Sequence, residues 1–394
     1  MTITPPDRRL MFALMALVLF CPAILYGQSA DEGQSSLPPG RAAAMADYRR
    51  ALAEYQSAQA SYDAAAGTYW IRIAERRHLR ASKRSNKEPL AIGDYVLAQP
   101  PVYTGPAKPR DPSKPEEPPE APPYVPLVAD FLAAARAEFN FVPRMPQSES
   151  EFKHAYAKVA LAAGLTADQI VRIYGFEAGG NGGYDIEAGL EHDKHARAIT
   201  TALGYNQLLA TNTVEILAES GRGFLQVLKA RAAQLPDGEG RAFDDKITIV
   251  RRMVGFALSV PDDWKEHEAL SKTQKGLGVH ALNLDVDVGP LLQTQKLLDS
   301  VIFARRMGLS RTLTAAELEM MNLTGDGNGF DMITMPYAWR DQVPTSNFFA
   351  RGGYSRNPVA QRNNVVGRLI ASTAARMDEE VKKQGAKELA AALH

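Results

Sequence analysis

The sequence predicts a mainly α-helical protein, in which a long N-terminal helix and a proline-rich linker precede a helical domain. Three observations support this prediction. From Leu127 onward, apolar residues recur at spacings of three and four, and few runs alternate as β-strands do. Gly and Pro separate these segments, as is typical of helices joined by short loops. Upstream, the run from 41 to 84 contains no proline and is rich in strong helix formers.

Length and composition indicate a globular protein of two or three domains. The chain has 394 residues, of which 45% are hydrophobic, and its 45 basic residues balance its 45 acidic ones. A balanced charge does not favour a nucleic-acid partner, and we expect none.

Residues 1–30 are predicted to be a secretory signal peptide. Arg8 and Arg9 precede an uncharged apolar stretch over 10–25, which is short for a transmembrane helix. An uncleaved membrane anchor is the alternative. The single cysteine, Cys21, lies in this stretch, so the mature chain would contain no disulfide. Export without disulfides indicates a periplasmic location in a bacterium.

Residues 41–85 are predicted to form one long helix. Four tyrosines spaced by seven share one of its faces: Tyr48, Tyr55, Tyr62 and Tyr69. They are interpreted either as a packing seam or as a docking stripe for a protein partner, for self-association or for sugar. The basic end of the helix, from Arg72 to Arg84, is interpreted as a solvated face or as a surface that attracts an anionic cell-surface polymer.

Residues 99–126 are predicted to be a linker. Eleven prolines fall between positions 100 and 126, and proline favours extended polyproline II, so the segment should be a semi-rigid spacer. Residues 127–390 form the predicted domain, which we expect to fold without residues 31–126. Its predicted helices are Leu127–Phe141, Glu151–Ala163, Thr166–Ala178, Tyr205–Glu219, Gly223–Gln234, Asp245–Ser259, Val288–Met307, Thr314–Met321 and Val359–Lys383.

The helix predicted over 166–178 places a carboxylate at the end of an apolar stripe. Thr166 and Gln169 have the spacing of a capping box, and Gly179 follows as a stop. Ile170, Ile173, Tyr174 and Glu177 share one face. Burial and the negative end of the helix dipole both disfavour a charged Glu177, so this side chain is a candidate general acid. The alternative is a glutamate that reaches water at the rim of the helix.

Two later segments agree in order and spacing with known motifs. Gly204-Tyr205-Asn206-Gln207 precedes a predicted helix, and Glu319-Met320-Met321-Asn322 precedes a glycine-rich stretch. Together with Glu177, and with a helix after an Asp/Asn-rich turn over 283–307, they resemble the motifs of lytic transglycosylases and goose-type lysozymes. The resemblance covers about 147–378 and implies a lysozyme-like helical fold for the domain.

The resemblance also implies roles for individual residues. Glu177 matches the family's single acid and base, Gln207 the glutamine that lines the sugar cleft, and Asn322 the asparagine that holds substrate near the acid. The residues predicted to bind substrate are Tyr184, Gly204, Tyr205, Gln207 and Asn322.

Three departures from the family pattern affect the expected site. Ala178 replaces a serine, Met321 replaces a tyrosine, and Tyr205-Asn206 replaces Leu-Met. The aromatic ring of Tyr205 is a candidate replacement for the contact that Met321 lacks.

An insert over 181–201 separates the first two motifs. Asp185 or Asp193 is a candidate second carboxylate, which a hydrolytic lysozyme would need to activate water. Glu191, His192, Asp193 and His195 do not match a recognisable metal site, so we predict no metal.

The glycine-rich stretch over 326–331 resembles a calcium loop only faintly, because Phe330 occupies a ligand position. It is interpreted as a turn in the cleft wall.

Two functions from different classes follow. The first is a lytic transglycosylase that cleaves the β-1,4 bond between N-acetylmuramic acid and N-acetylglucosamine in peptidoglycan, forming 1,6-anhydro ends without a cofactor. The second is a non-catalytic peptidoglycan-binding or envelope-assembly protein of the same fold. The absence of the family's serine at position 178 and tyrosine at position 321 favours the second function. The presence of Glu177, Gln207 and Asn322 in the family's order favours the first.

Overall fold

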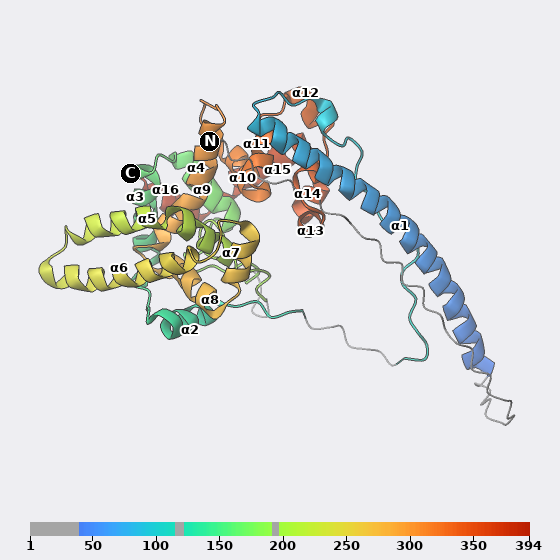
Figure 1. Cartoon of the computed structure of the whole chain (residues 1–394), viewed down its shortest axis with the longest axis horizontal. Helices are drawn as coiled ribbons and strands as arrows, with labels where there is room; N and C mark the ends of the chain where they lie inside the picture. The colour runs from blue at the N-terminus through green and yellow to red at the C-terminus, as the bar shows by residue number, and fades with distance from the viewer. Residues whose placement is uncertain (1–38, 115–121, 191–196) are drawn as a thin grey trace, which may run out of the picture. The chain divides into compact units, whose positions relative to one another are not determined.

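The computed structural model describes residues 39–114, 122–190 and 197–394, and helices dominate this part of the chain (Figure 1). Only three isolated β-bridges occur in it, and none extends into a sheet. The prediction of a mainly α protein is therefore confirmed. The predicted signal peptide, residues 1–30, lies outside the described residues. None of the described helices combines the length and apolar character that a membrane span requires.

The described residues divide into two compact units. The first comprises the described parts of Met1–Tyr55 and Ala107–Glu117, and the second comprises Gln56–Pro106 with the described parts of Pro118–His394. Helix α1 (Pro39–Ser85) contributes to both units. The second unit thus begins well before residue 127, where the sequence predicted the start of the helical domain.

The remaining helices follow α1 in the second unit. They are η1 (Ile92–Asp94), α2 (Val128–Phe139), α3 (Glu149–Ala162), α4 (Ala167–Glu177), α5 (Ala210–Ala232), α6 (Asp237–Ala257), α7 (Trp264–Ser271), α8 (Gln274–His280), η2 (Ala281–Leu284), α9 (Gly289–Arg306), α10 (Ala315–Thr324), α11 (Asp326–Ile333), α12 (Tyr337–Arg340), η3 (Thr345–Phe348), α13 (Arg351–Ser355), α14 (Pro358–Arg362), α15 (Val366–Glu380) and α16 (Gln384–Ala392).

Several helix boundaries differ from the predicted ones. The segments Tyr205–Glu219 and Gly223–Gln234 form a single helix, α5, that begins only at Ala210. The segment Val359–Lys383 is divided between α14 and α15. Residues 326–331, predicted as a turn, belong to α11. The missing side chain of Gly329 lets α11 pack tightly on α10, since a Cβ there would lie 2.3 Å from Met321 Cα.

Two apolar clusters form the core of the second unit. One is centred on α3, α4, α10 and α15, and the other on α2, α5, α6 and α8. In Figure 1, α5 and α6 run side by side as a long pair within the second cluster. Because α4 and α10 belong to one cluster and α5 to the other, a site built from all three lies where the two clusters meet.

The last basic residues of α1, from Arg80 to Arg84, pack within the second unit, whereas Arg72 is exposed. Arg80 is completely buried, where Nη2 donates to the backbone oxygen of Asn347 at 2.7 Å and Nε lies 3.4 Å from Asp331 Oδ2. Arg84 Nη1 donates to the same carboxylate oxygen at 2.6 Å. Lys83 Nζ donates to Asp94 Oδ2 at 2.7 Å. Contacts inside the second unit therefore account for Arg80, Lys83 and Arg84.

Two of the four α1 tyrosines pack within the second unit. Tyr69 is buried and its hydroxyl lies 2.6 Å from Ser346 Oγ. Tyr62 packs edge-on against Tyr103, with ring centroids 5.6 Å apart. The packing-seam interpretation thus holds for this pair. Tyr103 belongs to the proline-rich segment, so the start of that segment packs on α1 and is not a free spacer.

Candidate active site

Local sequence places Glu177 at the end of α4. Thr166 Oγ1 accepts from the Gln169 amide at 3.2 Å, and Gln169 Oε1 accepts from the Thr166 amide at 2.9 Å, so the predicted capping box is confirmed. Ile170 and Ile173 on the same face are fully buried. Glu177 is the last helical residue and is half-buried, so its carboxylate lies at the edge of the first apolar cluster.

The carboxylate of Glu177 meets the side chain of Asn322. Asn322 Nδ2 donates to Glu177 Oε1 at 2.8 Å, across a sequence separation of 145 residues. Asn322 projects from α10, whose start is fixed by its own capping box between Thr314 and Glu317. Two residues that the sequence assigned to the same site are therefore in direct contact.

A second carboxyl group lies buried beside this pair. Glu319 precedes Asn322 by nearly one turn of α10 and is only 2% exposed. Burial and the negative charge of Glu177 raise the pKa of Glu319 well above its usual range, against the opposing effects of Asn322 and Lys296. Glu319 Oε2 and Asn322 Oδ1 are both buried without a hydrogen-bond partner among the described residues. This environment favours the neutral, protonated form of Glu319.

Lys296 is a buried positive charge close to the two glutamates, and Arg77 also lines the neighbouring cavity. Its Nζ donates to Asn212 Oδ1 at 3.0 Å, which links α9 to α5. Burial lowers the pKa of Lys296, while the charges of Glu177 and Glu319 counteract that effect. The ammonium group therefore lies within electrostatic reach of both glutamates and stabilises a negative charge on Glu177.

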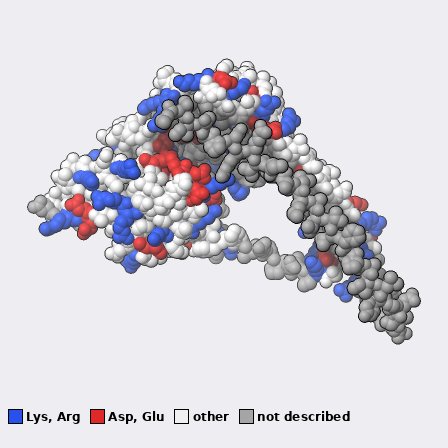
Figure 2. All heavy atoms as spheres, viewed as in Figure 1, with Lys and Arg blue, Asp and Glu red and all other residues white. Residues whose placement is uncertain are grey.

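Asn322 also lines a cavity of about 640 Å³, which is wide enough for a small ligand. Four carboxylates surround it, contributed by Glu215, Glu219, Asp299 and Asp326. Figure 2 shows Asp and Glu side chains gathered in one area near the middle of the view. The cavity thus presents many hydrogen-bond acceptors beside Asn322, while Glu177 itself is not among the residues that line it.

The same cavity contains one aromatic surface and one titratable group near neutrality. The Trp264 side chain is 44% exposed and supplies an apolar face. Burial and the charge of Glu219 raise the pKa of Glu215 to about 7, against the effects of Asn212 and Lys296. A carboxyl group that titrates near neutral pH is suited to proton transfer.

The second motif forms a tight turn and not the start of a helix. Gly204 has φ +80°, and a Cβ there would lie 2.7 Å from Gln293 Nε2. Gln207 Nε2 donates to the backbone oxygens of Gly204, at 2.9 Å, and Ile186, at 3.2 Å. Neither residue lines the cavity beside Asn322. Gly204 and Gln207 stabilise the turn itself in this structure.

Tyr205 does not have the accessible surface that its predicted role requires. It is completely buried, its ring packs against Phe152, Tyr156 and Tyr174, and its hydroxyl donates to Glu149. An aromatic ring surrounded by three others cannot contact a sugar, so Tyr205 is a core residue in this structure.

Tyr184 and Asp185 lie in the insert between the first two motifs. Tyr184 is half-buried and stacks on Phe152, with ring centroids 5.1 Å apart. Asp185 is exposed and does not line the cavity. The other candidate carboxylate, Asp193, lies outside the described residues, as do Glu191, His192 and His195. Among the described residues, no three His, Cys, Asp or Glu side chains are grouped as a metal site would require.

The sequence did not identify Lys296, Glu319, Glu215 or Trp264 as site residues. The only signal was for Glu319, which stands three positions before Asn322 and therefore shares its helix face. The other three come from helices α9, α5 and α7, whose packing brings them to the cavity.

Comparisons of this chain with protein-family models, with curated proteins and with solved structures find no match.

Proposed function

We propose that this protein cleaves the glycan strands of peptidoglycan, with Glu177 as both proton donor and proton acceptor. The observation that carries the proposal is the hydrogen bond between Asn322 and Glu177. It joins the first and third motifs of the resemblance to lytic transglycosylases and goose-type lysozymes at one point in space. The predicted signal peptide supports action outside the cytoplasm, in the periplasm of a bacterium.

The proposed reaction has two proton transfers at one carboxyl group. Protonated Glu177 gives its proton to the glycosidic oxygen, the C1–O bond breaks, and positive charge develops at C1 of the muramic residue. The Glu177 carboxylate then removes the proton of the 6-hydroxyl of the same residue, and O6 bonds to C1. The products are a free 4-hydroxyl and a 1,6-anhydro end, with no water consumed and no cofactor required.

The neighbours of Glu177 suit the second half of this cycle, in which Glu177 is a carboxylate. Asn322 and Lys296 stabilise the carboxylate formed after the first proton transfer. Asn322 also fixes the direction of that carboxylate, as a group that must act twice requires. The cavity beside Asn322 offers acceptors for sugar hydroxyls and the face of Trp264 for a sugar ring.

One observation favours a second reaction at the same site. Glu215 lies on a helix wall of the cavity and has a pKa of about 7, so it is a better candidate for activating water than the exposed Asp185. A hydrolytic lysozyme uses two carboxyl groups about 6.5–9.5 Å apart when it inverts configuration. Reducing products would show that water is the nucleophile, and Glu215→Gln would then be the variant that tests this role.

The test is digestion of purified sacculi, with products analysed by mass spectrometry before and after borohydride. We expect 1,6-anhydro-muropeptides, lighter by one water than hydrolytic products and inert to borohydride. Glu177→Gln should lower their release by about 10²–10⁴-fold and retain sacculus binding. Glu379→Gln, a change on an exposed helix face, is the matched control. Binding of sacculi without any release by the wild type would instead indicate the non-catalytic alternative.

A further inference from the structure

Two buried oxygen atoms on α10 have no hydrogen-bond donor. Glu319 Oε2 and Asn322 Oδ1 are both buried, and neither has a partner among the described residues. The two residues stand three positions apart on one helix, so their side chains are neighbours on one face. Buried polar atoms without a partner are rare in folded proteins, because each one destabilises the fold. Two of them within one helical turn therefore require an explanation.

The charges around Glu319 determine which of its two forms fits this position. Glu177 on α4 disfavours a negative charge on Glu319, and Lys296 on α9 favours one. Helices α11 and α15 also pack on α10, but none of their side chains is among the groups that shift the pKa of Glu319. Burial and Glu177 outweigh Lys296 and raise that pKa well above its usual range, so the protonated form is favoured.

A protonated Glu319 has the donor that the two oxygen atoms lack. A carboxylate only accepts hydrogen bonds, whereas a carboxylic acid also has one O–H to donate. The side chains of Glu319 and Asn322 lie within hydrogen-bonding range of each other. One O–H···O bond from Glu319 Oε2 to Asn322 Oδ1 would give both atoms a partner.

We propose that Glu319 is a positioning residue of the candidate active site, which donates its proton to Asn322 Oδ1 and thereby directs Asn322 Nδ2 toward Glu177. The asparagine amide has an acceptor on one branch and a donor on the other, so a donor at its oxygen selects one of its two flipped orientations. In that orientation Nδ2 donates to Glu177 Oε1 at 2.8 Å. Loss of the Glu319 proton creates an acceptor that competes with Glu177 for Nδ2. The catalytic meaning of this chain of hydrogen bonds rests on the proposed function, but the chain itself forms without substrate.

The first test follows the Asn322 side-chain amide of the full chain by nuclear magnetic resonance, with asparagine labelled by nitrogen-15. The Asn322 signal is the one that Asn322→Ala removes. In the wild type we expect it to shift with pH in two steps, one from Glu177 and one from Glu319. Glu319→Gln, whose carboxamide donates at every pH, should leave only the step from Glu177. The same two steps in Glu319→Gln and in the wild type would overturn the proposal.

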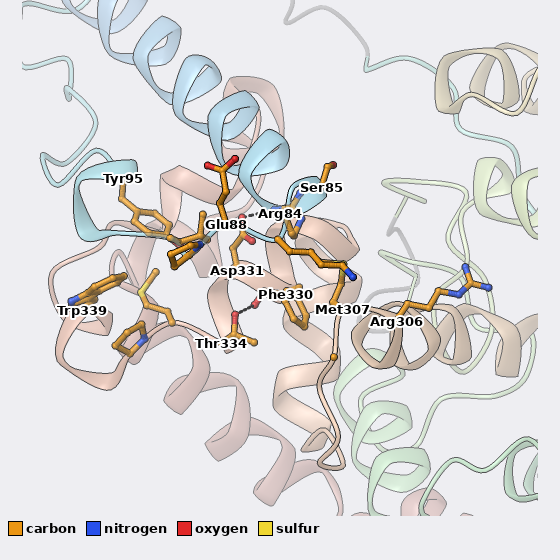
Figure 3. Close-up of a pocket in the computed structure, with 16 residues that line it drawn as sticks. Arg84, Ser85, Glu88, Tyr95, Arg306, Met307, Phe330, Asp331, Thr334 and Trp339 are labelled. Carbon is orange, nitrogen blue, oxygen red and sulfur yellow. Dashed lines mark hydrogen bonds and ion pairs between the residues drawn. The ribbon is translucent and has the colours of Figure 1, made fainter.

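Glu88→Gln is the matched control for this titration. Glu88 is an exposed carboxylate that lines a separate cavity, of about 740 Å³, at the end of α1 (Figure 3). That cavity shares no lining residue with the one beside Asn322. Since this substitution removes an equal charge far from Glu319 in the contact network, the Asn322 signal should keep both steps.

Two neutral variants then separate the donor of Glu319 from its size and its charge. Glu319→Gln keeps a donor, whereas Glu319→Met has a similar length and none. We expect Glu319→Gln to release muropeptides from sacculi at about the wild-type rate, and Glu319→Met to be about twofold to tenfold slower, as loss of one hydrogen bond implies. Equal rates for the two variants would overturn the positioning role. Absence of cleavage by the wild type contradicts the proposed function alone, because the amide titration decides the inference without substrate.

Discussion

The hydrogen bond between Asn322 and Glu177 determines how the carboxylate is directed. Asn322 is held on α10 by a capped helix start, and Glu177 is held on α4 in the same way. The order of motifs along the chain predicted both residues, since each motif carries its own local signal. Lys296 and Glu215 had no such signal, because their relation to Glu177 arises only from helix packing.

Replacing Asn322 tests whether this orientation matters for catalysis. Asn322→Ala removes a hydrogen bond to a charged group, which contributes about 1.5–3 kcal/mol, so muropeptide release should fall about tenfold to a hundredfold. Thermal unfolding monitored by circular dichroism should show an intact fold. Asn328→Ala, a change that removes only a bond to the Thr324 backbone oxygen, is the control. An unchanged rate of muropeptide release by Asn322→Ala would show that Asn322 has no role in catalysis.

The buried Glu319 predicts a pH dependence of stability. Its pKa is raised in the folded state, so the folded chain binds its proton more tightly than the unfolded chain does. The contribution of Glu319 to the free energy of unfolding is therefore fully present below its pKa in the unfolded chain, near 4.3. That contribution is lost as the pH rises toward its pKa in the folded chain. Glu319→Gln, which mimics the protonated form, should gain stability over the wild type as pH rises from 4.5 to 8.

A second glutamate on α10 provides the control of opposite sign. Burial raises the pKa of Glu317, but the hydrogen bonds from Arg311 and Thr314 together lower it by more than burial raises it. The net shift of its pKa is therefore downward. Glu317→Gln should destabilise the protein at neutral pH, and the difference should shrink as pH falls. Melting temperatures at several pH values measure both effects. A pH-independent difference for Glu319→Gln would contradict the buried, protonated state.

At the scale of elements, sequence patterns predicted most helices and missed how some begin and pack. The sequence pattern identified α3, α4, α9 and α10 to within a few residues. Periodicity also predicted a helix over 205–219, but its first residues form the turn that Gln207 stabilises, and α5 begins only at Ala210. It missed α11, because Asp326-Gly327-Asn328-Gly329 has the composition of a turn and tertiary packing on α10 overrides that preference.

The buried ion pairs at the end of α1 predict a large energetic effect at one residue. Asp331→Ala would leave the guanidinium of fully buried Arg80 without its carboxylate. Breaking a buried pair in this way typically costs about 3–5 kcal/mol of unfolding free energy. Urea unfolding should measure that loss. Glu268→Ala breaks only the exposed pair with Lys272 and should cost less than about 1 kcal/mol. A loss of similar size in both variants would mean that α1 is not docked.

At the scale of the whole molecule, the domain boundary predicted from composition differs from the one that residue contacts define in the structure. The end of the proline-rich composition predicted a boundary at 127, with an independent helix and linker before it. Composition does not reveal that Tyr69, Ile73 and Val96 form an apolar cluster, or that Arg80 enters the core. These contacts assign residues 56–106 to the second unit, which also contains the candidate site.

Two truncations distinguish these divisions of the chain. A chain that begins at Gln56 keeps every described contact of the second unit. It should melt cooperatively, at a temperature close to that of the mature protein. A chain that begins at Leu127 loses Arg80 and Tyr69 and leaves Asp331 and Ser346 without these buried partners. We expect it to melt at a lower temperature or to aggregate, because unpaired buried charge is costly. Calorimetry and limited proteolysis of both chains provide the measurement. Equal melting temperatures would restore the boundary at 127, and with it a domain that folds without α1.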